Sequence, residues 1–318
     1  MEERAGIGGS VPPARALGGA RLAFDPTDPR PSVGIATVNW NGWRDTLELL
    51  TSIERLAYPN FRIVVVDNGS VDGSEQHLRQ EYPNLTIVQT GRNLGYPGGA
   101  NVGARVFLEA GADFIWLINN DMVVEKDALS AMVEVARRDS AIGLVGSVVY
   151  HYHDRERVQF WGGAEYHRWT ATTRNLATAE AGRLDYIGGA SLLVRSALLR
   201  SIGLLNEQLV FYWDDVEFSL RARRAGWRLA VAEASRVFHK EGNTVGYKSP
   251  RADYLETESL TVFLFEQFGL LGIGPLVART LGKVFNRIAR RQPSHLWSTC
   301  RGLAAGVRRL VRPVAGIQ

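Results

Sequence analysis

The sequence has little cysteine and no long apolar run. Cys300 is the one cysteine among 318 residues, which excludes an intrachain disulfide and a cysteine-rich zinc site. A lone thiol favours a reducing compartment, so we expect a cytoplasmic protein. The first residues are acidic where a secretory signal is basic, and no apolar stretch of about 18 residues is uninterrupted. We therefore expect neither a signal peptide nor a spanning helix. The best candidate span, Leu260–Ala278, is broken by Glu266, Gln267 and several glycines.

Acidic residues are missing from one segment. Residues 270–318 contain nine Lys and Arg and no Asp or Glu, whereas the rest of the chain has 28 basic and 33 acidic residues. The isoelectric point of about 9.3 therefore comes from this tail. A mildly acidic body gives no indication of nucleic-acid binding, so we expect no nucleic-acid partner.

Two nucleotide-binding motifs are also missing. The pattern G-x-x-x-x-G-K-[ST] does not occur, which excludes a P-loop. The glycines between Gly95 and Gly103 do not fit G-x-G-x-x-G, and they follow a predicted loop rather than a strand. They are no dinucleotide-binding signature, but without Cβ atoms they would let a ligand approach the backbone closely.

The composition is otherwise that of a globular protein, with 45% hydrophobic and 22% charged residues. A chain of this length can bury a large core without metal or disulfide support. We divide it into a poorly ordered leader at 1–31, one α/β domain at 32–269, and a basic helical extension at 270–318.

Strand and helix patterns alternate through the first half. We expect strands at 33–39, 62–67, 85–89, 114–118 and 143–150, and helices at 46–56, 74–80, 101–110 and 127–138. Such alternation predicts βαβ units and a mainly parallel sheet with helices on both faces. The second half is less regular. We expect strands there at 158–164, 186–194, 227–231 and 237–239, and helices at 215–225, 252–268, 277–291 and 296–311.

Polar side chains follow three of the predicted strands. They form the clusters Asn39 with Asn41, Asp67 with Asn68, and Asn119 with Asp121. Ligands of open parallel sheets bind at the carboxyl ends of the strands, so three clusters in series favour a site over simple turns. Asp121 at such an edge could hold Mg²⁺ or Mn²⁺, and the alternative is a turn-forming or capping aspartate.

A second acidic group begins a predicted helix. Asp214, Asp215 and Glu217 stand within four positions after Trp213. Paired carboxylates suit a general base, and the alternative is a set of acids favoured by the helix dipole. The helix start would lower the pKa of Asp215 and keep it ionised. His239 ends a short predicted strand and is either a structural histidine or a ligand.

The order of these motifs resembles family 2 glycosyltransferases with the GT-A fold, most closely the bacterial rhamnosyltransferase-like branch. The resemblance covers Val33–Gly269. It rests on five segments that occur in the same order, Val66–Ser74, Gly91–Gly103, Leu117–Asp121, Tyr186–Ala190 and Trp213–Glu217 with Arg221 and Gly226-Trp227.

This resemblance implies an inverting transfer of a sugar from a nucleotide diphosphate to an acceptor hydroxyl. Asp67 would contact the nucleotide base with Asn39 beside it, and Asn93 and Gly95 would line the nucleotide and diphosphate pocket. The family's D-x-D position is occupied by Asn119, Asn120 and Asp121, and Asp121 would bind Mg²⁺ or Mn²⁺.

The remaining roles follow from the second half of the resemblance. Asp215 would be the general base, with Asp214 before it as the other carboxylate of the pair. Gly188, Gly189 and Trp213 would shape the acceptor or sugar pocket. His239 would complete the metal shell.

Two residues depart from the family pattern. Asn119 stands where the first aspartate of D-x-D is expected, and Asp214 stands where the pair has a glutamate. The first departure is the one feature that favours an inactive sugar-nucleotide-binding or scaffold protein. A nucleotidyltransferase is a further alternative, but it would need a basic loop at the first strand end, and residues 39–42 contain no lysine.

The branch favours dTDP-L-rhamnose as donor, with UDP- and GDP-sugars behind it. The acceptor is a glycan, a lipid-linked glycan or a small natural product. For the basic tail, three interpretations stay open: peripheral contact with the inner face of the cell membrane, packing as a helical hairpin, or contact between copies in a homo-oligomer.

Overall fold

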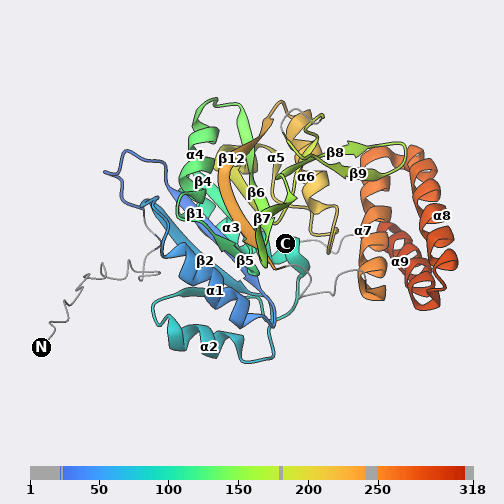
Figure 1. The fold of residues 1–318 in the computed structure, drawn as a ribbon, viewed down its shortest axis with the longest axis horizontal. Helices are drawn as coiled ribbons and strands as arrows, with labels where there is room; N and C mark the ends of the chain where they lie inside the picture. Colours follow the sequence, from blue (N-terminus) through green and yellow to red (C-terminus); the bar gives the residue numbers. More distant parts are fainter. Residues whose placement is uncertain (1–21, 23, 179–181, 241–248, 312–318) are drawn as a thin grey trace, which may run out of the picture.

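The computed structural model describes residues 22, 24–178, 182–240 and 249–311. Two parts lie side by side in Figure 1, a domain built around one large sheet and a group of three long helices. The predicted leader lies mostly outside the described residues, as do residues 312–318 of the tail.

The first half of the chain forms the expected βαβ units. Its elements are β1 (Val33–Asn39), α1 (Trp43–Ile53), β2 (Phe61–Asp67), α2 (Ser74–Glu81), β3 (Thr86–Gln89), α3 (Gly95–Glu109), β4 (Phe114–Asn119), β5 (Met122–Val124), α4 (Ala128–Arg137) and β6 (Ile142–His151). The strands β3, β2, β1 and β4 lie in that order and pair in parallel. Their carboxyl ends therefore meet at one edge of the sheet.

The second half completes the sheet. It forms β7 (Asp154–Phe160), β8 (Gly163–His167), β9 (Thr172–Asn175), β10 (Tyr186–Ile187), β11 (Ser191–Arg195), α5 (Ser196–Ile202), α6 (Asp214–Arg224) and β12 (Arg228–His239). The large sheet has the order β3-β2-β1-β4-β11-β6-β12-β5, with β7 paired to β6, and β10-β8-β9 form a small separate sheet. β11 runs antiparallel to β4 and β6, and β5 runs antiparallel to β12. The sheet is therefore mixed: β1, β2, β3, β4, β6 and β12 share one direction, and β5, β7 and β11 run opposite to them.

Several element boundaries differ from the sequence-based prediction. The single strands expected at 158–164 and 186–194 are each two strands, because chain turns at Gly162 and at 188–190 interrupt them. The two short strands expected after residue 226 are one strand, β12, with a register irregularity between Ala232 and Arg236.

The helix expected at 101–110 begins at Gly95, so its glycines are helical rather than part of a loop. Close packing of α3 on the sheet explains them. A Cβ at Gly103 would lie 2.7 Å from the Cβ of Ala36, and one at Gly99 would lie 2.8 Å from Val38. These glycines therefore allow the helix to approach β1.

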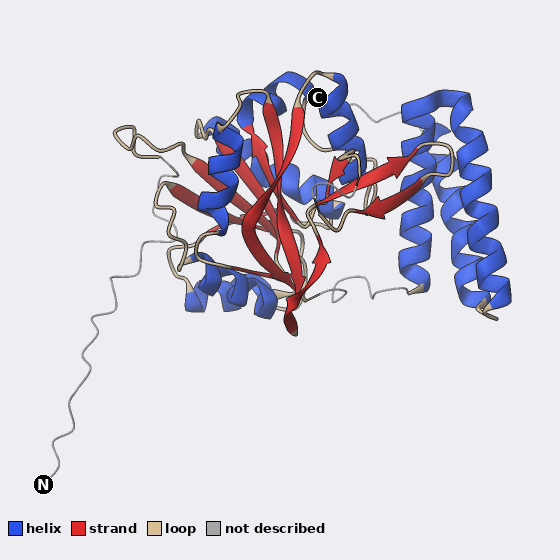
Figure 2. Ribbon diagram, turned by 45° about the horizontal axis from the view of Figure 1, so that its top comes forward, coloured by secondary structure: helices blue, strands red, loops and turns tan. Residues whose placement is uncertain are grey.

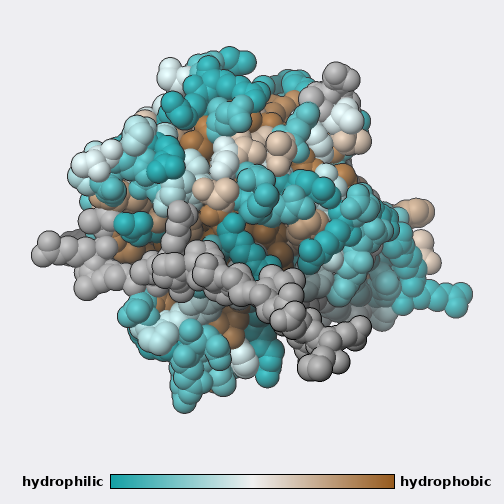
Figure 3. All heavy atoms as spheres, turned by 60° about the vertical axis from the view of Figure 1, so that its left-hand side comes forward, coloured by the Kyte–Doolittle hydropathy of each residue, from teal (hydrophilic) through white to brown (hydrophobic). Residues whose placement is uncertain are grey.

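Helices cover both faces of the large sheet, as expected. On one face Leu50 of α1 and Met132 of α4 are buried with Trp116 of β4. On the other face Phe107 of α3 and Phe218 of α6 are buried with neighbours of Trp116 in the same strand. The alternation of side chains along β4 thus serves two cores, one on each side. Figure 2 shows the strands with helices around them, and Figure 3 shows one face with largely hydrophilic side chains and apolar ones visible between them.

The three long helices are α7 (Pro250–Phe268), α8 (Ile273–Ala289) and α9 (Pro293–Val311), with a short 3-10 turn, η1 (Gly269–Gly272), after α7. Ser249 caps α7, because its Oγ accepts a hydrogen bond from the N–H of Ala252 at 3.1 Å. Gly302 and Gly306 of α9 lie against α7, where a Cβ would meet Tyr254 and Thr261. The predicted domain boundary at residue 269 stays a prediction. Helix α7 lies on the α/β-domain side of this boundary, yet it packs against α9 of the predicted extension.

One helical run has the length and composition of a membrane span. It covers 250–289, and 44% of its most apolar window is buried. The run is not straight, since η1 separates α7 from α8 and the two helices lie side by side in Figures 1 and 2. Less than half of this window is buried, and a single helix that qualifies by length and composition alone is weak evidence for a span, because core helices pass the same test.

Candidate active site

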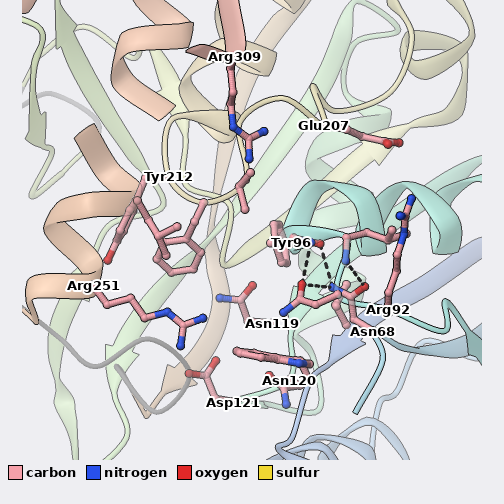
Figure 4. A pocket seen from close by; sticks show the side chains of 18 of the residues that line it. Asn68, Arg92, Tyr96, Asn119, Asn120, Asp121, Glu207, Tyr212, Arg251 and Arg309 are labelled. Carbon is pink, nitrogen blue, oxygen red and sulfur yellow. Dashed lines mark hydrogen bonds between the residues drawn. The ribbon is translucent and has the colours of Figure 1, made fainter. Parts of the chain in front are cut away.

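A cavity of about 790 Å³ lies at the carboxyl ends of β1 and β4. Residues from distant segments surround it, as Figure 4 shows. Its lining includes Trp40, Arg92, Asn93, Gly95, Tyr96, Asn119, Asn120, Asp121, Tyr212, His239, Arg251 and Arg309. The sequence-predicted cluster at 119–121 therefore faces the same space as His239.

Asp121 and His239 meet on one side of this cavity. The imidazole Nε2 of His239 lies 3.3 Å from Oδ1 of Asp121, and its Nδ1 lies 3.2 Å from Oε1 of Gln159. Antiparallel pairing of β5 with β12 places His239 opposite Met122, the residue after Asp121. Among the described residues no group of three or more His, Cys, Asp or Glu could hold a metal ion. Two protein ligands are enough where substrate phosphates supply the others.

Two of the asparagines predicted for the site are held by side-chain hydrogen bonds. Asn120 donates through Nδ2 to Oγ1 of Thr46 at 3.1 Å and to the carbonyl of Gly42. Asn93 accepts from the N–H of Gly95 at 2.8 Å, which supports the left-handed φ of 78° at that glycine. This turn presents the start of α3 to the cavity.

Asn39 and Asp67 do not line the cavity. Both are buried, with 0% and 2% of their surface exposed. The amide of Asn39 bonds to Thr46 and Ser70, and the carboxylate of Asp67 accepts from the N–H of Ser70 and from Gln89. Through these hydrogen bonds both side chains hold the loops that follow β1 and β2.

Asp215 faces a second cavity of about 860 Å³. Its walls are the β8–β9 hairpin, the start of α6, and the facing sides of α7 and α8. Trp213 and Asp215 both line it, and Tyr212 borders both cavities. Asp214 is buried and lines neither of them. Of the two carboxylates, Asp215 is thus the accessible one.

The predicted lowering of the pKa of Asp215 is wrong. Burial raises the pKa of Asp215, and this outweighs the hydrogen bonds that it accepts from the N–H groups of Gly189 and Val216. Burial, and then the charge of Asp215, raise the pKa of Asp214 well above its usual range. The helix start does not offset the loss of solvation at two adjacent acids.

Backbone strain marks the chain before this pair. Tyr212 and Trp213 have φ angles of 64° and 68°, in the left-handed region that bulky residues rarely occupy. Two consecutive residues in this region raise the free energy of the folded chain locally, and the packing around them must offset that strain. The turn that they form directs Tyr212 to the boundary of the two cavities.

Tyr96 connects the two cavities. Its hydroxyl donates to the carbonyl of Gly189 at 3.2 Å, and the N–H of Gly189 donates to Asp215 at 3.0 Å. Burial raises the pKa of Tyr96, with further contributions from the charges of Asp214, Asp215 and Asp121. The tyrosine therefore lies within electrostatic reach of both predicted carboxylate centres.

Sequence reasoning missed several residues of the site. Arg92 directly precedes Asn93 in the segment Gly91–Gly103, so this segment was a signal by which Arg92 could have been found. Arg251 reaches the first cavity from α7, with its guanidinium 5.5 Å from the ring centre of Trp40. No local pattern indicates this contact, because it depends on the packing of α7 beside the sheet domain. Gly188 lines neither cavity and lies in the turn against Phe160.

Comparison with known proteins gives consistent matches. The family model described as "Glycosyltransferase like family 2" matches residues 29–251. An N-acetylglucosaminyl-diphospho-decaprenol L-rhamnosyltransferase of Mycobacterium tuberculosis is 24% identical over 230 residues, covering 64% of this chain and 73% of its own length. The galactofuranosyltransferase GlfT1 of the same species is 26% identical over 273 residues, with coverages of 80% and 88%.

Solved structures share the fold. The mannosyltransferase PcManGT from Pyrobaculum calidifontis, in complex with GDP-Man and Mn²⁺, has a TM-score of 0.57 and 18% identity, and the match covers 91% of this chain and 90% of that one. GalNAc-T7 with UDP, GalNAc and Mn²⁺ has a TM-score of 0.62 and 13% identity, with coverages of 89% and 57%.

Proposed function

This chain belongs to the family described as glycosyltransferase like family 2, and on that premise we propose the donor, the ion and the residues of its reaction. It is a hexosyltransferase of GT-A fold that acts on a nucleotide sugar. We propose dTDP-L-rhamnose as donor and a hydroxyl of a glycan or lipid-linked glycan as acceptor. The rhamnosyltransferase among the relatives supports this choice of sugar.

The meeting of Asp121 and His239 at the first cavity carries the proposal. A carboxylate and an imidazole 3.3 Å apart, on a cavity wall, suit Mn²⁺ or Mg²⁺ with the remaining positions left for phosphate oxygens and water. Such an ion would neutralise charge on the leaving diphosphate. Two solved relatives of the fold contain Mn²⁺, which supports a divalent ion here.

The first cavity is the proposed donor site. Arg92 and Arg251 face it and supply positive charge for the diphosphate, and Asn93 and Gly95 shape the turn beside it. Asn119 and Asn120 hold the chain that carries Asp121. We propose that Asp67 and Asn39 hold the loops after β1 and β2 in the conformation that binds the nucleotide. If those loops open, the two side chains would contact the base.

Asp215 is the proposed general base. It lies at the second cavity, is oriented by the N–H of Gly189, and is more accessible than Asp214. The carboxylate would take the proton of the acceptor hydroxyl as its oxygen attacks the anomeric carbon from the face opposite the diphosphate. The second cavity, which Trp213 also lines, is then the acceptor groove. Inversion at the anomeric carbon follows without a covalent intermediate.

A thermal-shift panel tests this assignment. The full chain is measured with dTDP-, UDP- and GDP-sugars, each with and without Mn²⁺ or Mg²⁺. A ligand at about 100 times its Kd stabilises by about 2.7 kcal/mol, which is easily measured. We expect the largest metal-dependent shift with dTDP-L-rhamnose and its loss in Asp121→Asn. A shift with another nucleotide would change the donor, and a shift that needs no metal in either protein would refute the role of Asp121.

A further inference from the structure

Helix α8 has its charged face turned inward. Arg279 lies 3.3 Å from Glu256 of α7, Lys283 also pairs with Glu256, and Arg287 lies 2.8 Å from Asp253. These three cations recur every four residues, so they form one row along α8. Each cation of this row is thus paired with a carboxylate of α7, and the row also lines the acceptor groove.

The opposite side of α8 is apolar and exposed. Val277, Leu281, Phe285 and Ile288 have exposures of 49%, 62%, 74% and 60%. Their three- and four-residue spacing places them in one row. Of the fourteen large apolar side chains that are exposed in the described part of the chain, ten lie between Leu270 and Val311. This concentration is far above the scattered pattern of an ordinary surface.

Positive charge borders the apolar row. Arg291 comes three residues after Ile288, at the end of α8, and Arg308 lies on the neighbouring helix α9, whereas Arg290 lines the acceptor groove with the basic row. Arg291 and Arg308 are exposed, and their guanidinium groups have no ion pair with any residue that the structure describes. The segment from 270 to 318 offers no carboxylate of its own. Trp297, near the same turn, is 66% exposed.

We propose that this outer α8 surface, formed by Val277, Leu281, Phe285 and Ile288 with Arg291, docks on an anionic lipid bilayer. Apolar side chains enter the interface between headgroups and acyl chains, and flanking arginines attract anionic headgroups. An exposed tryptophan beside them suits the same interface.

Charge complementarity favours lipid over a second copy of the chain. Two copies joined through this surface would bring Arg291 of one close to Arg291 of the other without an acidic partner in the segment. Repulsion between these charges opposes such a contact, whereas an anionic bilayer supplies the missing negative charge.

Docking in this way sets the acceptor groove beside the membrane. The inner side of α8 forms one wall of the cavity that contains Asp215, and the outer side would rest in the lipid interface. A lipid-linked acceptor could then stay anchored while its sugar enters the groove. This consequence rests on the proposed function, whereas docking itself can be measured independently.

Vesicle flotation of the full chain tests the proposal. The vesicles are phosphatidylcholine alone, or equal parts of phosphatidylcholine and phosphatidylglycerol. We expect binding to the anionic vesicles that weakens as salt is raised. The double variant Leu281→Glu/Phe285→Glu should bind at least about ten-fold more weakly, because it places charge in the apolar row. Val71→Glu is the control, because Val71 is 90% exposed, lies outside the three long helices and lines neither cavity, so this variant should bind like the parent.

Three readouts separate the outcomes. Unfolding midpoints of the parent and both variants show whether each protein is folded. The donor thermal shift reports the proposed function, so a normal shift without flotation would overturn the docking surface alone. Flotation without any donor shift would instead count against the donor assignment. A parent that does not float but is a dimer by light scattering, and becomes a monomer in the double variant, would assign the surface to a second copy.

Discussion

The backbone N–H of Gly189 donates a hydrogen bond to Oδ2 of Asp215 at 3.0 Å. A Cβ at this glycine would lie 3.3 Å from the Cβ of Asp215, so the two backbones are close. The carbonyl of the same glycine accepts from Tyr96, a residue of the first cavity. One peptide segment therefore connects the proposed donor site with the proposed base.

Removing the hydroxyl of Tyr96 tests this connection. Tyr96→Phe loses one hydrogen bond, which is worth about 0.5–1.5 kcal/mol and corresponds to a reduction in kcat of roughly two- to thirteen-fold. Because the bond positions Asp215 and does not hold the donor, we expect little change in the donor thermal shift. Steady-state kinetics gives kcat and KM. A rise in KM alone, with kcat unchanged, would contradict a positioning role.

The two adjacent aspartates should differ in their effect on transfer. Asp215→Asn removes the proposed base, and we expect a loss of about 10²–10⁴ in kcat with donor binding retained. Asp214→Asn changes a buried carboxylate that lines neither cavity, so its loss should be smaller. Equal losses in both variants, or a larger one in Asp214→Asn, would reverse the assignment.

Stability should fall as the pH rises past the ordinary range of an aspartate. The pKa values of Asp214 and Asp215 are raised in the folded state above the usual 3.8, so the folded chain holds protons that the unfolded chain has released. The free energy of unfolding therefore decreases as the pH rises from 3.8 through the raised pKa values. Asp214→Asn removes most of this penalty and should be more stable than the parent at neutral pH. Urea unfolding across this range measures it, and identical pH dependence in the two proteins would refute the cause.

The same shift predicts where activity is lost in acid. Transfer requires Asp215 to be ionised, and its pKa is raised by burial. The acid limb of kcat/KM against pH should therefore lie above 3.8. A limb at or below that value, measured where the protein is still folded, would argue against Asp215 as the base.

Metal dependence should reside in Asp121 and His239. We expect His239→Gln to raise the Mn²⁺ concentration needed for donor binding by about 10–100-fold, and Asp121→Asn to raise it further. Titration of Mn²⁺ at fixed donor, followed by thermal shift, measures the change. His167→Gln is the control, because this histidine lies in β8 and lines neither cavity. An unchanged titration in His239→Gln would remove it from the site.

One ion pair should dominate the stability of the α6 region. Arg221 bonds to the buried Glu217 at 2.9 Å and donates to the carbonyls of Ile202 and Leu204 at 2.6 and 2.8 Å. Arg221→Ala removes the donor from both carbonyls and leaves the buried Glu217 with a hydrogen bond from Gln267 at 3.4 Å, so we expect a loss of about 2–4 kcal/mol. The matched control is Arg138→Ala, which breaks an exposed i,i+4 pair with Glu134 and should change little. Urea unfolding compares them, and similar effects would contradict this reading.

The sequence by itself determined the parallel βαβ core and the residues that end its strands. Alternating patterns along short segments decide whether each becomes a strand or a helix, and these patterns also place Asp121 after β4 and Asp215 at the start of α6. The motif order was enough to indicate the family. All of these signals lie within a few residues of one another along the chain, so no knowledge of long-range packing was needed.

Only the tertiary structure decided which of these groups meet. Asp121 and His239 come together because β5 and β12 pair antiparallel, and Gly189 reaches Asp215 because β10, which ends just before this glycine, packs against α6. The tail is the clearest case. The amphipathic pattern of α8 contains a basic row and an apolar row. The sequence pattern alone does not say which of the two rows packs against the rest of the protein. The carboxylates of α7 decided this, because Asp253 and Glu256 pair with the basic row of α8 and leave its apolar row outside.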